Sequence, residues 1–199
     1  MSGIAKTFKA FRIHNDGEGY RSGIETLAID DLSEGDVVIR GEWSSINFKD
    51  ALAATGKGKI LKKFPLNGGI DVAGEVVSSD CERFKPGDKV LVTGCHLSEK
   101  RDGGYSQYSR LDSRDVIPLP EGLSTRDAMA IGTAGYTSML CVMALEDQGI
   151  TPASGEVLVT GAAGGVGSVA IAILSKLGYS VTASTGRTSE EAFLKGLGA

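Results

Sequence analysis

The 199-residue sequence lacks the long apolar runs and the cysteine patterns that mark membrane and secreted proteins. No apolar stretch approaches the roughly 20 residues that cross a bilayer, and the N-terminal MSGIAKTFKAF has no signal-peptide core. The three cysteines, Cys81, Cys95 and Cys141, are scattered, which favours reduced thiols over a disulfide framework. We therefore expect a cytoplasmic protein with no membrane partner.

Metal-ligand spacings and an excess of one charge are also missing. Cys95 and His96 are adjacent, but no C-x-x-C or H-x-x-x-H spacing provides the converging ligands that zinc needs. The formal net charge is only -4, with acids and bases interleaved along the chain, so no basic surface for nucleic-acid phosphates is indicated. The sequence predicts neither a metal site nor a nucleic-acid partner.

The chain does contain the elements of a β-rich N-terminal domain. Two segments are rich in β-branched residues and are predicted as strands, Gly35–Trp43 and Ile70–Ser79. A third strand is predicted within Lys85–Gly94, where a Pro-Gly turn signal precedes an apolar run. In Asn47–Gly56, an Asn is followed three residues later by an Asp and then by small helix formers, which is typical of a helix N-terminus. We predict a first domain over residues 1–124.

After this region the pattern becomes helical and then alternates between strand and helix. Thr125–Gly149 has apolar residues at helical spacing and few charges. It is followed by a strand at Glu156–Thr160, a helix at Val166–Leu177 and a strand at Tyr179–Thr185. This β-α-β order predicts a second domain of the α/β class over residues 125–199.

A glycine turn joins the first strand of this unit to its helix. Gly161, Gly164 and Gly167 are spaced by three, follow a predicted strand and open a predicted helix. Glycines in this strand-turn-helix context are typical of a dinucleotide-binding turn. They permit a tight turn, a close backbone approach to the pyrophosphate and helix packing, while the helix N-terminus attracts the phosphate charge. The alternative is a tight turn in a ligand-free domain. A P-loop is disfavoured because no Gly-Lys-Ser/Thr follows.

The end of the second strand indicates which dinucleotide is bound. An acid about 20 residues after the turn would bind the ribose 2'-hydroxyl of NAD, and this chain instead has Ser184, Thr185, Gly186 and Arg187. Arginine binds phosphate in a bidentate manner, so we predict NADPH as the cofactor. The alternative is that Arg187 is a solvated loop cation.

Several segments together resemble a known family. WSSINFKDALAATGKGKI, GIDVAGEVVSS, RFKPGDKVLVTG, GGYSQYSR, AIGTAGYTSMLCVMALE and VLVTGAAGGVGS are similar to the zinc-free, quinone-oxidoreductase-like branch of the medium-chain dehydrogenase/reductase superfamily, and within it to the acryloyl-CoA reductase (NADPH) subgroup. The resemblance implies a GroES-like catalytic domain, then a Rossmann domain with a doubly wound parallel sheet. It also implies that this chain is truncated after the first half of the Rossmann domain, and that the full-length protein is a homodimer.

The resemblance further implies a metal-free reaction. Zinc-dependent relatives have a His-Glu pair where this chain has Ile70 and Asp71. The expected reaction is hydride transfer from NADPH to an activated carbon-carbon double bond, with acryloyl-CoA as the substrate. The alternatives are a quinone substrate, a non-catalytic NADPH-binding protein and an inactive fragment.

The resemblance places Asn47 and Asp50 at the nicotinamide end of the site as candidate catalytic residues. Both residues also suit plain helix capping, and the sequence leaves these roles open. Phe48 stands where many relatives have a cofactor-contacting Tyr. The resemblance places Thr133 either near the nicotinamide or in a helix-capping or packing role. The lysines of Gly56–Phe64 either attract coenzyme A phosphates or form a solvated loop. The predicted cofactor-binding residues are Phe48, Thr133, Ala163, Gly164, Gly165, Val166, Ser184, Thr185, Gly186 and Arg187.

Overall fold

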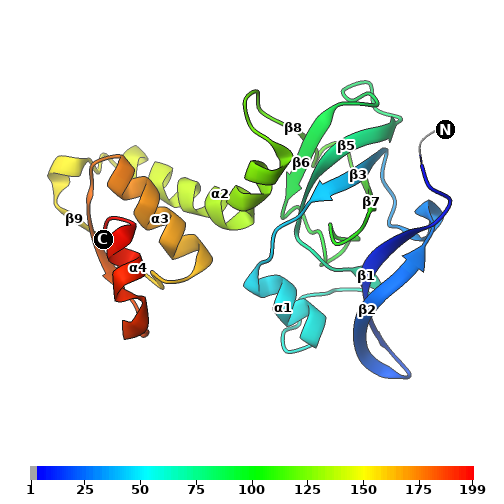
Figure 1. Cartoon of the computed structure of the whole chain (residues 1–199), viewed down its shortest axis with the longest axis horizontal. Coiled ribbons are helices and arrows are strands. Elements are labelled where there is room, and N and C mark those ends of the chain that lie inside the picture. Colours follow the sequence, from blue (N-terminus) through cyan, green and yellow to red (C-terminus); the bar gives the residue numbers. More distant parts are fainter. Residues whose placement is uncertain (1–3) are drawn as a thin grey trace. The chain divides into compact units, whose positions relative to one another are not determined.

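A computed structural model describes residues 4–199 of the chain and divides it into two compact units. Unit 1 ends at Gly132, and unit 2 runs from Thr133 to Ala199. The division falls inside helix α2 (Thr125–Asp147), where Gly132 leaves the helical conformation with φ 51° and ψ -164° (Figure 1). Glycine adopts a positive φ without a Cβ penalty. The boundary predicted after residue 124 lies at the start of α2 and stays a prediction.

Unit 1 is built from two antiparallel sheets. The larger has the strand order β7-β3-β5-β6-β8 and the smaller the order β2-β1-β4. The strands predicted from the sequence correspond to β3, β5 and β6 and are confirmed. The strands are β1 (Phe8–Asp16), β2 (Gly19–Leu27), β3 (Val37–Trp43), β4 (Leu66–Asn67), β5 (Asp71–Ser79), β6 (Lys89–Thr93), β7 (Tyr108–Leu111) and β8 (Ile117–Pro118).

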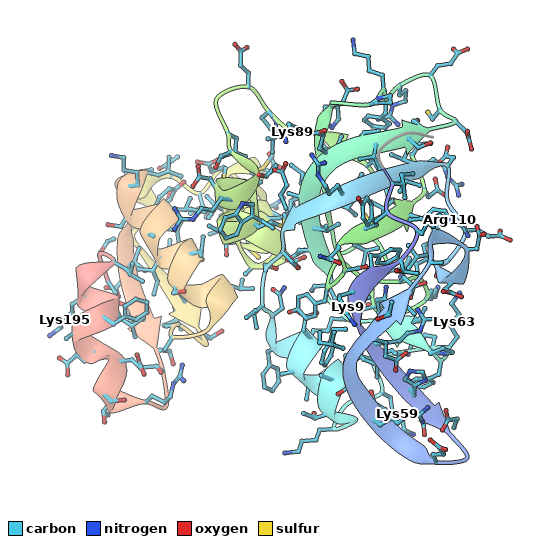
Figure 2. All side chains as sticks on the ribbon, turned by 45° about the vertical axis from the view of Figure 1, so that its right-hand side comes forward. Lys9, Lys59, Lys63, Lys89, Arg110 and Lys195 are labelled. Atoms are coloured by element: carbon cyan, nitrogen blue, oxygen red, sulfur yellow. The ribbon has the colours of Figure 1, made fainter. Side chains whose placement is uncertain are left out.

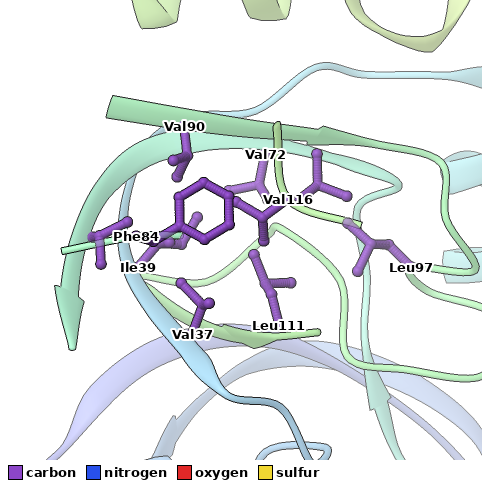
Figure 3. Packing of buried hydrophobic residues seen from close by; sticks show 10 residues of the cluster. Val37, Ile39, Val72, Phe84, Val90, Leu97, Leu111 and Val116 are labelled. Carbon is purple, nitrogen blue, oxygen red and sulfur yellow. The ribbon is translucent and has the colours of Figure 1, made fainter. Parts of the chain in front are cut away.

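The first three residues of strand β3, Val37 to Ile39, are buried on both faces, which explains this apolar run, whereas Arg40, Glu42 and Trp43 are exposed. Val37 and Ile39 point into the main hydrophobic cluster of unit 1, together with residues from the strands around it (Figure 3). Val38 points the other way, into a second cluster with Phe8 and Tyr108. Successive side chains of a strand lie on opposite faces, so β3 joins the two cores. This rigid centre supports the loop and helix that follow it.

That helix, α1 (Phe48–Thr55), is fixed at both ends. At its N-terminus, the Asp50 carboxylate accepts a hydrogen bond from the Asn47 backbone N–H at 2.8 Å. At its C-terminus, Gly56 has a left-handed φ of 68°, and hydroxyls of β2 donate to the last carbonyls, with Tyr20 bonding Ala53 and Ser22 bonding Ala54. Side chains therefore bind groups at both ends of the helix, including two of its last carbonyls, and the predicted helix is confirmed.

Unit 2 contains the predicted β-α-β unit. Strands β9 (Glu156–Thr160) and β10 (Ser180–Ser184) pair in parallel, with Val157 opposite Val181. Helix α3 (Gly165–Lys176) connects them, and α4 (Glu191–Gly196) follows. A cluster that includes Val142, Ile171, Leu174 and Leu194 packs these elements together. The remaining short 3₁₀ turns of the chain are Ile29–Asp31, Pro152–Ser154 and Thr188–Glu190.

Helix α2 is long and apolar enough to cross a membrane by length and composition alone, a feature that the sequence-based expectation missed. Its first part buries Ala128 and Met129 against Ala73 in unit 1, and its second part buries Val142 in unit 2. The helix is also interrupted at Gly132. Ala128, Met129 and Val142 are thus parts of two protein cores, whereas other apolar residues of the helix, among them Met139, Leu140 and Met143, are 40–46% exposed.

Candidate active site

The glycine turn of unit 2 has the close backbone packing that its spacing predicts. Gly161 leaves β9 with a φ of 59°, and the Gly164 N–H donates to its carbonyl at 2.9 Å. A Cβ on Gly167 would lie 2.5 Å from the Gly161 oxygen and 2.8 Å from the Ala162 Cα. Only glycine therefore fits at position 167. Helix α3 begins directly after the turn, so its first N–H groups lack intrahelical partners.

A pocket of about 410 Å³ lies beside this turn. Arg187 reaches back across it, because its guanidinium donates to the Ala163 carbonyl at 2.7 Å. Gly165 and Val166 form the first turn of α3 and line a neighbouring pocket of about 440 Å³. The structure thus brings together eight of the ten predicted cofactor residues. The residues that line the pocket beside the turn are Gly161, Ala163, Gly164, Ser184, Thr185, Gly186 and Arg187.

Thr133 begins the part of α2 that belongs to unit 2. The Thr137 hydroxyl donates to its carbonyl at 2.7 Å, which continues the helix after the break. One residue further, Ala134 packs close to Gly165, because a Cβ on that glycine would lie 3.4 Å from the Ala134 Cβ. The Ser138 hydroxyl also donates to the Val166 carbonyl at 2.7 Å. The segment after Thr133 therefore supports the glycine turn from within unit 2.

In unit 1, Asp50 is buried, with only 4% of its surface exposed, and both carboxylate oxygens are used. One oxygen accepts from the Asn47 backbone N–H and the other from the Ile70 backbone N–H at 3.0 Å. The second bond joins α1 to the segment before β5, a link that the sequence did not reveal. The capping role of Asp50 is thus observed, and its catalytic role stays a prediction.

Asn47 belongs to a buried polar cluster centred on Asp71. Its side-chain nitrogen donates to the Ser45 hydroxyl at 2.9 Å and to the Asp71 carboxylate at 3.0 Å. Asp71 is fully buried and also accepts from the Ser45 hydroxyl and, at 3.3 Å, from the Gly94 N–H. Gly132 lies against it, because a Cβ there would be 3.0 Å from the Asp71 oxygen.

Sequence reasoning did not assign Asp71 or Ser45 to the site. The sequence does contain one signal for this cluster, because Asp71 stands in the apolar strand segment IDVAGEVV. A carboxylate buried with such a strand needs hydrogen-bond donors close to it. The cluster orients the Asn47 amide and uses its N–H groups internally. A substrate oxygen that accepts from Asn47 must therefore compete with Ser45 and Asp71.

Tyr105 is a further residue of this region that the sequence left without a role. Its hydroxyl donates to the Ser45 carbonyl at 2.9 Å. Burial, followed by the nearby carboxylates of Asp50 and Asp71, raises the pKa of the Tyr105 hydroxyl well above its usual range. The group stays protonated at neutral pH and acts as a hydrogen-bond donor.

Two other predicted features of unit 1 lie at its surface. Phe48 is 79% exposed at the start of α1. The lysines of Gly56–Phe64 are all exposed, and Lys59 and Lys63 are labelled among the side chains in Figure 2. Over residues 4–199, the lysines that form ion pairs are Lys49, Lys89 and Lys195. The lysines of this loop are therefore exposed and outside these ion pairs, and Lys63 lines a pocket of about 880 Å³ together with Lys100, Arg101 and Arg114.

Candidate metal ligands do not converge in the part of the chain that the structure describes. No group of three or more His, Cys, Asp or Glu residues there could hold a metal ion, and all three cysteines are free thiols.

Comparisons with known proteins follow the same division of the chain. The alcohol dehydrogenase GroES-like domain family matches residues 33–121. The acrylyl-CoA reductase AcuI of Ruegeria pomeroyi is 50% identical over 194 residues, which cover 96% of this chain and 59% of the relative. The Bacillus subtilis protein YhfP, named as a quinone oxidoreductase, is 44% identical over 196 residues, or 98% of this chain and 59% of its own length.

Solved structures agree with these sequence relatives. The yhdH oxidoreductase of Salmonella enterica, crystallised with NADP, is 50% identical with a TM-score of 0.93, and the match covers 96% of this chain and 59% of that one. Bacillus subtilis yhfP, crystallised with NAD, is 43% identical with a TM-score of 0.91, covering 98% and 59%. The chain thus spans about 59% of the length of these proteins. It has a GroES-like domain followed by a β-α-β unit of the Rossmann type, and it belongs to the medium-chain dehydrogenase/reductase family, in which it is similar to proteins named acrylyl-CoA reductase and quinone oxidoreductase.

Proposed function

We propose that the whole protein reduces the activated carbon-carbon double bond of an enoyl thioester with NADPH, and that acryloyl-CoA is the substrate. The observation that carries this proposal is the 50% identity, over 96% of the chain, to a protein named acrylyl-CoA reductase. Because the chain spans only 59% of that relative, the activity is proposed for the protein as a whole.

The glycine turn fits a dinucleotide. Glycines at 164 and 167 leave the backbone open where a Cβ would meet the Gly161 carbonyl, and the N-terminus of α3 favours a bound pyrophosphate. We propose that Ala163, Gly164, Gly165 and Val166 hold the pyrophosphate there.

The same pocket supports the choice of NADPH over NADH. Ser184, Thr185, Gly186 and Arg187 line it, with the Arg187 guanidinium at the turn. A guanidinium and two hydroxyls suit a ribose 2'-phosphate. A relative crystallised with NADP supports this assignment, whereas the relative crystallised with NAD favours the other cofactor.

When bound, NADPH would supply the hydride for the β-carbon of the double bond, and a proton added at the α-carbon would complete the reduction. We propose that Asn47 donates a hydrogen bond to the thioester oxygen, where negative charge develops, and that Phe48 and Thr133 contact the nicotinamide. The Asp71 and Ser45 contacts hold the Asn47 amide in one orientation. Asp50 keeps Asn47 at the start of α1, and the further part of this proposal is that Asp50 takes part in proton transfer by positioning the water or donor that protonates the substrate.

The experiment measures NADPH oxidation by the whole protein with acryloyl-CoA and, separately, with a simple quinone. We expect turnover of acryloyl-CoA with propanoyl-CoA as the product. Rapid reduction of the quinone with no turnover of acryloyl-CoA would contradict the proposal.

Quinone reduction is the second candidate function. It is supported by the 44% identity to YhfP, which is named as a quinone oxidoreductase. Both candidates use the same cofactor site, so the two substrates in one assay separate them.

A further inference from the structure

Unit 1 contains a small pocket on one side of α1 that none of the predicted roles explains. Its volume is about 290 Å³, which is near the lower limit for ligand pockets. At about 30 Å³ per water-sized atom, it holds on the order of ten heavy atoms. Four of the six lining residues are apolar. The lining residues are Phe11, Ile46, Asp50, Ala51, Ala54 and Tyr105.

The walls of this pocket are fixed before any ligand binds. The Tyr105 ring packs against glycine backbone, because a Cβ on Gly69 would lie 2.6 Å from that ring and one on Gly68 would lie 3.1 Å from it. Phe11 meets Tyr105 edge to face, with 6.3 Å between ring centroids. The opposite wall is α1, which is held at both ends. A preformed pocket loses little entropy on binding.

The pocket has room on the side of α1 because the lining residues of this helix face have small side chains. Ala51 and Ala54 are three positions apart, so they lie on the same face of α1. Their methyl groups leave the space that larger side chains would fill. Ile46, which is 90% exposed, forms the rim and directly precedes Asn47. The pocket therefore begins beside the residue proposed to bind the thioester oxygen.

The polar atoms of the pocket are already committed to the protein. The Tyr105 hydroxyl donates its proton to the Ser45 carbonyl, and both Asp50 oxygens accept backbone N–H groups. A carboxylate offers no proton to a ligand. Neither side chain thus has an uncommitted proton for a carbonyl oxygen inside the pocket, because an oxygen that took the Tyr105 proton would break its bond to Ser45, and burying an unbonded carbonyl is costly. A hydrocarbon chain meets no such cost.

We propose that this pocket binds the hydrocarbon end of the acyl group of a CoA thioester, with Ala54 setting the space for it. This inference rests on the proposed function and names the part of the substrate that unit 1 recognises. A quinone, which has carbonyl oxygens at opposite ends of its ring, fits the pocket poorly because one oxygen would be buried without a donor. An acyl chain carries its single carbonyl at the end that stays near Asn47.

The test is calorimetric titration of the whole protein with propanoyl-CoA, butanoyl-CoA and hexanoyl-CoA, which bind without turnover. In the wild type we expect about tenfold tighter binding of hexanoyl-CoA than of propanoyl-CoA, because added methylene groups are buried. Ala54→Leu fills the pocket and should abolish this difference. Thr55→Leu places the same side chain at an exposed neighbour on α1 outside the pocket and should preserve it.

A second pair of variants tests the rim without altering the core. Ile46→Ala should reduce the preference for hexanoyl-CoA severalfold, whereas Ile24→Ala, an equally simple truncation at a 67% exposed position of β2, should leave it unchanged. Affinities that do not depend on chain length, or equal effects of Ala54→Leu and Thr55→Leu, would overturn the inference. The acryloyl-CoA turnover assay is separate, so the proposed function can fail while the titration still decides where the chain binds.

Discussion

The two candidate sites of this protein are built from different parts of the polypeptide. In unit 1 the groups are buried side chains, and Asp71 and Asp50 hold their neighbours through hydrogen bonds at about 3 Å. In unit 2 the groups are backbone amides of an exposed turn, and Gly167 acts through the Cβ that it lacks. The first site is thus preorganised by hydrogen bonds between side chains and backbone. The second depends on the space that the glycines of the turn leave open, and on Arg187.

The largest effect is expected where that arginine is reversed in charge. Arg187→Glu removes the charge-assisted contact with a 2'-phosphate and adds repulsion, so NADPH affinity should fall about 100-fold, or about 2.7 kcal/mol. NADH affinity should change little. Fluorescence titration of both cofactors measures this in the whole protein. Lys176→Glu makes the same charge change at the exposed end of α3, and equal losses in both variants would refute the specific role of Arg187.

The close packing of Gly167 in the glycine turn can be tested by adding a side chain at that position. Gly167→Val forces side-chain atoms against the Gly161 carbonyl and Ala162, and overpacking of this kind costs about 3 kcal/mol. Urea denaturation should show this loss in the free energy of unfolding. Gly186→Val is the matched control, since a Cβ at that position has no atom within 4 Å. Unchanged stability of Gly167→Val would contradict the close packing described for the turn.

The polar cluster of unit 1 should respond to loss of a single acceptor. Asp71→Asn keeps the shape but replaces one acceptor oxygen by an NH₂ donor, which then faces either the Gly94 N–H or the donors of Ser45 and Asn47 and costs about 2 kcal/mol. The same denaturation measurement applies, with Asp80→Asn at an exposed position just after β5 as the control. If both variants unfold at the same urea concentration, the cluster contributes no stability.

The smallest effect is a pH dependence caused by Tyr105. The pKa of the Tyr105 hydroxyl is raised in the folded protein above the ordinary value of about 10. Its contribution to the free energy of unfolding is therefore complete below about pH 10 and is lost as the pH rises further. At pH 9, Tyr105→Phe should cost about 1 kcal/mol through the lost hydrogen bond, and this difference should shrink as the pH rises above about 10. Tyr136→Phe, at a 55% exposed position, is the control. A constant difference for Tyr105→Phe would contradict the assigned cause.

The contrast between the sites also explains which features could be predicted from the sequence. Gly161, Gly164 and Gly167 act locally, because strand, turn and helix are consecutive in the chain, so their spacing predicts the observed geometry. The capping of α1 is equally local, since Asn47 and Asp50 are three residues apart. The Asp50 bond to Ile70 spans 20 residues, and the Tyr105 bond to Ser45 spans 60. No local pattern contains such contacts.

The sequence by itself determined strands β3, β5 and β6 of unit 1, the β-α-β unit, the glycine turn and the position of Arg187 beside it. These features follow from periodicity and from the conformational freedom of glycine, which act over a few residues. Only the tertiary structure decided that Ser45, Asn47 and Asp71 form one buried cluster, and that Ala51 and Ala54 open a pocket towards Tyr105. Both depend on how separate strands and a helix pack in space, because burial leaves each polar group only the partners that packing brings within reach.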